Sequence, residues 1–139
     1  MKKSTMHIFY IFLWTLFLCF IIFCYRINHI FLSDTSKVHF IESYGWQVEQ
    51  SHFMCEKVKI PYVFSDSEKE YNLIQKKAGF DFENYKGKTL DRFSYRLLNH
   101  PDDKKYAYIN IFVYNNKIVG ADVVSPSLSG NIRAINDKE

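Results

Sequence analysis

The sequence predicts an α+β protein in which one apolar N-terminal helix precedes a small domain built on an antiparallel sheet. An uninterrupted apolar run occupies residues 6–25. A helical pattern behind a capping residue occupies residues 65–78. Three alternating patterns then follow, over residues 89–99, 106–114 and 117–124. Separate helix and strand stretches of this kind indicate a sheet with helices packed on one face.

The apolar run from residue 6 to residue 25 contains no Asp, Glu, Lys, Arg, Gly or Pro. Twelve of its twenty residues are Ile, Leu or Phe. Twenty residues of helix extend about 30 Å, which is the thickness of the hydrocarbon core of a bilayer. Their transfer into lipid outweighs the cost of His7 near one end. We therefore expect residues 1–25 to form a transmembrane anchor, with the lipid bilayer as the partner of residues 6–25.

A cleaved signal peptide is the alternative reading of this run. Lys2 and Lys3 match the basic start of such a peptide, but its apolar region is usually shorter and small residues precede its cleavage site. Residues 23–26 (FCYR) offer no small residue, which favours an uncleaved anchor. The two lysines also favour a cytoplasmic N-terminus, although Arg26 on the other flank weakens this bias. The expected location is a single-pass cell membrane protein with an extracytoplasmic C-terminal domain.

Residues 26–36 are expected to connect the anchor to a domain that spans residues 37–139. From Arg26 onward, sixteen Lys and Arg residues oppose fifteen Asp and Glu residues. A near-neutral domain without a basic block is not typical of nucleic-acid binding, so no nucleic acid is expected as a partner. Cys55 is the only cysteine after the apolar run, so no disulfide can form within the domain. We interpret it as a small, partly buried side chain on a strand.

The first half of the domain contains two helix patterns and one strand pattern. A short amphipathic helix is expected over residues 36–44, and Gly45 can end it in a left-handed conformation. A strand follows over residues 56–60. The clearest helix covers residues 65–78, where Ser or Asp at the start can cap it and Gly79 ends it.

The second half of the domain alternates between two faces along each strand pattern. Residues 106–114 and 117–124 are joined by Asn115 and Asn116, which tolerate the positive φ angles of a two-residue hairpin turn. Residues 125–130 are expected to form a loop, and the tail after them is polar. The sheet face away from the helices is expected to lie near water, at Arg92, Arg96, Tyr108 and Asn110.

A pattern of residues is spread along the domain and consists of Gly45, Trp46, Ile60, Pro61, Phe64, Tyr71, Asn72, Gln75, Gly79, Asp81, Tyr85, Gly87, Lys88, Arg92, Tyr95, Asn99, Val119, Gly120 and Asp122. This pattern resembles that of DUF4830, a bacterial family of unknown function. The resemblance covers roughly residues 43–129. Ala121 departs from the pattern, since Gly is expected there. The resemblance implies a shared fold and a small, membrane-attached protein, and it names no reaction.

Five polar residues on or beside the predicted sheet form the candidate binding site. Asn72 and Gln75 are three residues apart, so they share one face of their helix. Asp122 lies on a strand among apolar neighbours, Arg92 lies on another strand, and Tyr95 follows it. One interpretation is a ligand-binding groove. The other is structural: Asn72 and Gln75 hold loop backbone groups, and Arg92 neutralises Asp122.

No pattern in the sequence indicates a catalytic residue, a metal ligand set or a cofactor, and none is expected. His52 and Cys55 are three residues apart, but no second pair of ligands accompanies them. Asp102 and Asp103 follow a proline, where a turn is the usual setting for such residues. An enzyme is therefore not the favoured class.

The sequence favours a membrane-anchored module that binds an unknown protein, peptide or envelope ligand outside the cell. Two alternatives stay open. An envelope-associated hydrolase would need a nucleophile or carboxylate near a base within a cleft. A small accessory subunit would be recognised through its transmembrane helix. The surface expected for the favoured module, if its rings are exposed, consists of Tyr106, Tyr108, Phe112 and Tyr114.

Overall fold

The computed structural model describes residues 2–30, 32–101, 103, 105–126 and 131–138, with side chains at all of these positions except 2–6, 8, 9, 25–30 and 131. The chain divides into two compact units, Met1–Phe31 and Leu32–Glu139. The loop predicted over residues 125–130 and the predicted pair Asp102 and Asp103 lie partly outside the described residues.

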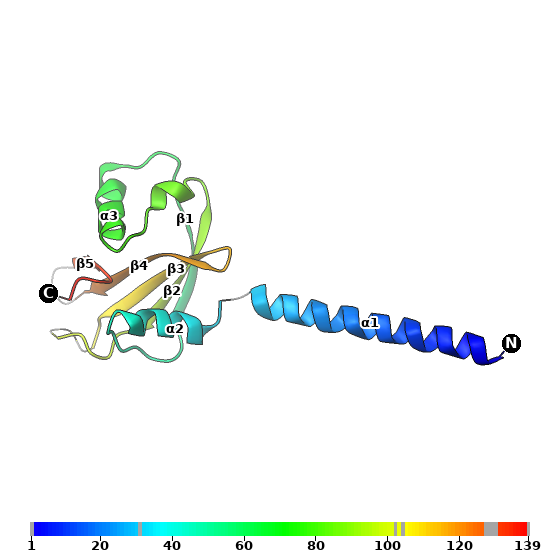
Figure 1. Ribbon diagram of the computed structural model, residues 1–139. Helices are drawn as coiled ribbons and strands as arrows, with labels where there is room; N and C mark the ends of the chain where they lie inside the picture. Colours follow the sequence, from blue (N-terminus) through cyan, green and yellow to red (C-terminus); the bar gives the residue numbers. More distant parts are fainter. Residues whose placement is uncertain (1, 31, 102, 104, 127–130, 139) are drawn as a thin grey trace. The chain divides into compact units, whose positions relative to one another are not determined.

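The first unit consists of helix α1 (Lys2–Ile30), drawn in blue in Figure 1. Where its side chains are described, residues 10–23 are exposed. Among the residues described in this way, no helix is both long and apolar enough to cross a membrane, so the predicted membrane span over residues 6–25 is not confirmed. That segment includes positions 6, 8, 9 and 25, whose side chains are not described.

The second unit is an antiparallel sheet with helices, which confirms the predicted α+β class. Its strands lie in the order β1-β2-β3-β4-β5, and each neighbouring pair is antiparallel. Strand β5 falls in the tail that the sequence pattern described only as polar. The elements are α2 (Asp34–Ser43), β1 (Met54–Lys59), α3 (Asp66–Lys77), the 3-10 helix η1 (Phe82–Tyr85), β2 (Thr89–Arg96), β3 (Tyr108–Tyr114), β4 (Lys117–Ser125) and β5 (Asn131–Ala134).

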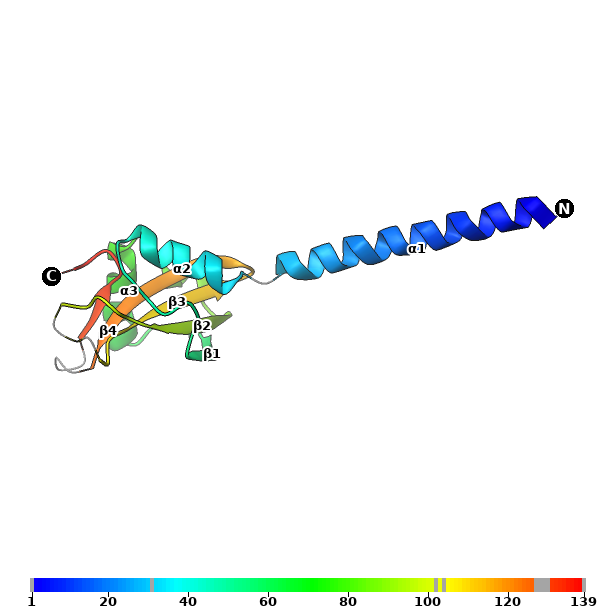
Figure 2. The ribbon, with the colours of Figure 1, turned by 90° about the horizontal axis from the view of Figure 1, so that it is seen from below.

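Helices α2 and α3 cover opposite faces of the sheet, as Figures 1 and 2 show from two directions. Ile41 of α2 belongs to the same buried cluster as Ile109 and Ile111 of β3. Phe112 of β3 points the other way and belongs to a second cluster, against which Tyr71 of α3 packs. The expectation that the helices pack on one face is therefore wrong.

The sheet face that was expected near water is largely covered by α3 and η1. Asn110 is only 4% exposed, while Arg92 and Tyr108 are half-buried and Arg96 is exposed. The physical reason lies in β3, because a strand with large apolar residues on both faces is stabilised when both faces are covered. Phe112, which is 1% exposed, is the apolar residue on the α3 side.

Each of the two buried clusters draws its residues from Leu32 onward. The second unit therefore carries its own core, and residues 32–139 contain every residue of the clusters that stabilise it.

Local signals placed the ends of α3 and the hairpin correctly, whereas α2 begins at Asp34, two residues before the predicted start. Ser65 caps α3 in a capping box with Glu68, whose carboxylate accepts the Ser65 N–H at 2.7 Å. Asn115 and Asn116 have φ angles of 47° and 62° in the turn between β3 and β4, as predicted. Cys55, in contrast, is exposed on β1 rather than partly buried.

Candidate functional site

Asp122 of β4 is a fully buried carboxyl group that joins the sheet to α3. Its Oδ2 accepts hydrogen bonds from the Tyr71 hydroxyl and from Gln75 Nε2, the latter at 3.1 Å. Its Oδ1 accepts a hydrogen bond from Asn110 Nδ2 at 2.9 Å. Two donors thus come from α3 and one from β3, so this carboxyl group fixes the helix on the sheet.

A second set of hydrogen bonds orients the side chains that bind Asp122. Gln75 Oε1 accepts the backbone N–H of Ala121 at 2.9 Å, so its amide nitrogen faces the carboxyl group. Asn110 Oδ1 accepts the Ser94 hydroxyl at 2.7 Å, which leaves Nδ2 as the donor to Asp122. The geometry around the carboxyl group is therefore set by the neighbouring strands as well as by α3.

Burial controls the ionisation of this network. Burial raises the pKa of Asp122 from 3.8 to about 6, while hydrogen bonds from Tyr71 and Asn110 and the charge of Arg92 limit the rise. Burial also raises the pKa of Tyr71 well above 10, and the Asp122 charge raises it further. Tyr71 consequently remains a protonated donor, whereas Asp122 binds a proton near pH 6.

A pocket of about 350 Å³ lies next to this network, between α3 and the sheet. Tyr71 and Asn110 form part of its wall, and Arg92 and Tyr108 add polar atoms. The volume falls at the lower end of small-molecule sites in proteins. The apolar part of the wall includes Val58, Ile60, Phe64, Phe82, Phe112 and Val124.

Arg92 of β2 lines the pocket and forms an ion pair with Glu56 of β1, which lies directly opposite it in the sheet. Its Nε is buried without a hydrogen-bond partner, and among the described residues it is the only buried side-chain nitrogen or oxygen in that state. Arg92 influences Asp122 through its charge, which lowers the Asp122 pKa. The structure therefore places Gln75, Asp122 and Arg92 around one site.

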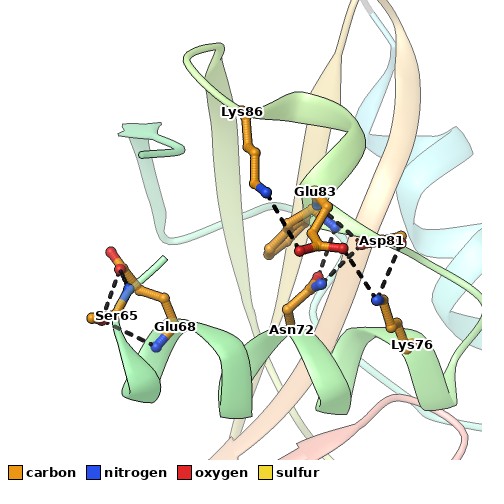
Figure 3. A network of polar contacts seen from close by, with 8 residues as sticks. Ser65, Glu68, Asn72, Lys76, Asp81, Glu83 and Lys86 are labelled. Carbon is orange, nitrogen blue, oxygen red and sulfur yellow. Dashed lines mark hydrogen bonds and ion pairs between the residues drawn. The ribbon is translucent and has the colours of Figure 1, made fainter. Parts of the chain in front are cut away.

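Asn72 shares the buried face of α3 with Gln75, but its hydrogen bonds go to Asp81 and Phe82 and not to Asp122. Its Nδ2 donates to Asp81 Oδ1 at 2.8 Å, and its Oδ1 accepts the Phe82 N–H at 2.7 Å. Figure 3 shows this contact within a wider network that includes the α3 capping box and Lys76 beside Asp81. Asn72 thus holds η1 against α3, which matches the structural interpretation of this residue.

Tyr95 lies on the opposite face of the sheet, beneath α2, and the structure does not bring it to Asp122. Its hydroxyl donates to Asp34 Oδ1 at 2.5 Å. Burial raises the pKa of Tyr95, and the Asp34 carboxylate raises it further. Tyr95 therefore stabilises the N-terminus of α2, and it does not line the pocket.

Three residues of the site were missed from the sequence, namely Tyr71, Asn110 and Ser94. Tyr71 stands four residues before Gln75, a helical spacing that would have placed both on one face. Asn110 interrupts an apolar strand, which is a signal for a buried hydrogen-bonded amide. The expected aromatic surface is wrong at Phe112, which is buried, although Tyr106 is 54% exposed.

Comparison with known proteins gives one match. No protein with a curated description matches the chain, and no solved structure does. The family described as Domain of unknown function (DUF4830) matches residues 40–123, which is more than half of the chain. The matched range contains α3, η1 and β1 to β3, together with Asp122 of β4. The chain therefore belongs to the DUF4830 family.

Proposed function

We propose that residues 32–139 form a binding module that takes a small, mostly apolar molecule in the pocket between α3 and the sheet. The observation that carries the proposal is the combination of an apolar wall with Tyr71, Asn110 and Arg92. A carboxyl group with a raised pKa, Asp122, lies directly behind them. Apolar pockets with a few convergent polar groups and a perturbed ionisation are typical of ligand sites.

The hydrogen bonds accepted by Asp122 also support a pocket that is preformed in the absence of a ligand. They tie Tyr71 and Gln75 of α3 to the sheet, and the capping box fixes the start of the same helix. A wall that is already ordered loses little conformational entropy on binding. The ligand therefore needs only modest contacts to bind with measurable affinity.

No observation of this site favours the hydrolase alternative. Among the described residues that line the pocket there is no Ser, Thr, Cys or His. The Glu68 carboxylate in the lining is held by the Ser65 cap, and Asp122 is fully buried in its three hydrogen bonds. The accessory-subunit alternative stays a prediction, which exchange of residues 7–25 for an unrelated anchor would test.

A neutral fluorescent dye, 1-N-phenylnaphthylamine, tests the proposed pocket in residues 32–139. Ile132 lines the pocket and is 40% exposed, so Ile132→Trp should obstruct it without disturbing the core. Leu73→Trp is the matched control, because Leu73 is 59% exposed on α3 and does not line the pocket. We expect at least tenfold weaker dye binding in Ile132→Trp alone. Equal binding by all three proteins would contradict the proposal.

We further propose that residues 6–25 anchor this module in the cell membrane, with the N-terminus in the cytoplasm and the domain outside. The proposal is supported by composition, since the run holds twelve Ile, Leu or Phe residues and no Asp, Glu, Lys or Arg. Lys2 and Lys3 before the run support the orientation.

Cys55 provides a test of this placement, because it is exposed on β1. In a chain carrying Cys19→Ser and Cys24→Ser, Cys55 is the only thiol. A membrane-impermeant maleimide should label it in intact cells, and the chain should stay with the membranes during alkaline extraction. Labelling only after lysis would contradict the orientation, and release by alkali would contradict the anchor.

A further inference from the structure

We infer that β1 binds an extended peptide segment of a partner protein as an additional antiparallel strand, and that acidic residues alternate with apolar residues along this segment. The inference goes beyond the proposed pocket, because it assigns a function to the free edge of the sheet.

Strand β1 forms one border of the sheet. It is the first strand in the order β1-β2-β3-β4-β5, so it pairs with β2 on one side only. Its residues are exposed except Glu56 and Val58, which are half-buried. Among the described residues, no helix or loop forms a backbone hydrogen bond to β1 on the side away from β2. This side is therefore an unpaired strand edge, which can accept a further strand.

Ile60, directly after β1, shows which backbone groups face the free edge. Its N–H donates to Lys88 O at 2.8 Å, and its C=O accepts from Gly87 N–H at 2.8 Å. Hydrogen-bonded and non-hydrogen-bonded positions alternate along an antiparallel pair, so every second residue before Ile60 also bonds to β2. The residues between them direct their N–H and C=O groups away from β2. These residues are Cys55, Lys57 and Lys59, and all three are exposed.

The side chains at the free edge favour acidic residues in the added strand. Lys57 and Lys59 are two positions apart, so they lie on the same face of the sheet. Among the described residues, Lys57 forms an ion pair with Asp91 of β2, and Lys59 has no ion-pair partner. Opposite charges on directly opposed residues stabilise a pair of strands, so Asp or Glu is the best match for each lysine.

A second copy of the chain is a poor occupant of this edge. Antiparallel pairing of two β1 strands, centred on the three edge residues, places Lys57 opposite the same residue of the other copy. Like charges directly opposite one another destabilise a sheet, and edge lysines protect proteins against such pairing. A partner with acidic residues at these positions does not meet this repulsion.

The other face of the added strand meets apolar side chains. Val58 and Ile60 alternate with the lysines and belong to the wall of the pocket. Val58 is half-buried, so an apolar residue beside it removes further apolar surface from water. Glu56, also on this face, is already paired with Arg92. The partner segment is therefore expected to alternate between acidic and apolar residues.

Three capped heptapeptides test this preference in residues 32–139. The first, acetyl-EVELEVE-amide, has the expected alternation. The second, acetyl-KVKLKVK-amide, reverses its charges, and the third, acetyl-EEVVLEE-amide, keeps its composition without the alternation. Titrations followed by backbone amide chemical shifts should give the first peptide an affinity at least fivefold above that of either control.

Hydrogen exchange in the wild-type domain tests the position of the added strand without any variant. In the free domain, the amides of Cys55, Lys57 and Lys59 should exchange at least tenfold faster than those of Glu56 and Val58, which bond to β2. Saturation with acetyl-EVELEVE-amide should reduce this difference to less than threefold, because the edge amides then bond to the peptide.

Lys57→Pro removes one N–H group from the free edge, and proline is tolerated at such positions of an edge strand. Lys57→Ala is the matched control, because it removes the same charge and keeps the N–H group. Binding of acetyl-EVELEVE-amide should be at least fivefold weaker in Lys57→Pro than in Lys57→Ala.

Equal affinity for the three peptides, an exchange pattern that the first peptide leaves unchanged, or equal binding by the two variants would overturn the inference. A domain that dimerises through β1 without peptide would also overturn it, in favour of a second copy at the edge. Binding of 1-N-phenylnaphthylamine without binding of any peptide would overturn the inference alone and leave the proposed pocket in place.

Discussion

Replacement of Asp122 by Asn is expected to change how the stability of the domain depends on pH. Burial raises the pKa of Asp122 from 3.8 to about 6, so between these pH values the folded state holds a proton that the unfolded state has released. The stability from this group is fully present below pH 3.8 and is lost as pH rises through about 6. The change amounts to about 3 kcal/mol, at about 1.4 kcal/mol for each pKa unit.

Asp122→Asn removes this dependence, because an amide does not ionise in this range. The NH₂ group of the new amide replaces a carboxylate oxygen that accepts hydrogen bonds. It therefore lies against donors, either Asn110 Nδ2 or the Tyr71 hydroxyl and Gln75 Nε2, and cannot bond to them. The lost hydrogen bond should cost about 1–3 kcal/mol at every pH. The free energy of unfolding of the wild type, minus that of the variant, should therefore fall by about 3 kcal/mol between pH 4 and pH 8.

Urea denaturation of residues 32–139, followed by Trp46 fluorescence, measures this difference. Trp46 is 4% exposed and its Nε1 donates to Ile135 O at 2.7 Å, so unfolding changes its surroundings. The free energy of unfolding of each protein is plotted against pH, and one curve is subtracted from the other. Groups such as Asp34 change stability with pH in the opposite direction, because hydrogen bonds outweigh burial there and lower the pKa, and the subtraction cancels their contribution. Asp91→Asn, which removes an exposed partner of Lys57, is the control, and its effect should stay below about 1 kcal/mol. A wild-type minus Asp122→Asn difference that is constant from pH 4 to pH 8 would refute the reasoning.

Three further substitutions should change stability in the same assay. Gly120→Ala should destabilise the domain by about 1–3 kcal/mol, because its Cβ would contact the Phe82 ring; an unchanged urea midpoint would show that Phe82 moves freely. Ser65→Ala should cost about 1 kcal/mol through loss of the α3 capping box, and a loss under 0.3 kcal/mol would argue against that cap. Asn116→Gly should raise stability by up to about 1 kcal/mol, because residue 116 has a φ of 62° that suits glycine; a lower midpoint would contradict this.

The helices and the hairpin could be predicted because their signals are local. The Ser65 cap, the glycine that follows α3, and the two asparagines between β3 and β4 each determine the conformation of a few neighbouring residues. Strand β5 had no such signal. It has only four residues, and it pairs with β4 from beyond the loop predicted over residues 125–130.

The placement of α2 and α3 on opposite faces depends on how distant residues pack. Its signal was present in β3, where Ile109 and Ile111 alternate with the equally apolar Phe112. A strand with apolar residues on both sides requires cover on both sides. The same alternation separates Arg92 from Tyr95, because residues an odd number of positions apart on a strand face opposite ways.

The partner of Arg92 could not be predicted from the residues around it. Glu56 lies opposite Arg92 only through the register between β1 and β2, which are about thirty residues apart in the chain. The Asp122 network likewise combines α3, β3 and β4. The sequence therefore identified several members of the site, while their partners emerged only from the packed structure.

A methyl chemical-shift map of the isoleucines and valines in residues 32–139, recorded with and without 1-N-phenylnaphthylamine, tests the binding pocket most directly. The largest shifts are expected at Val58, Val124 and Ile132, whose side chains line the pocket. The result that would contradict the account is an absence of shifts at these three residues, or larger shifts at Val38 and Ile41 of α2, which packs on the other face of the sheet.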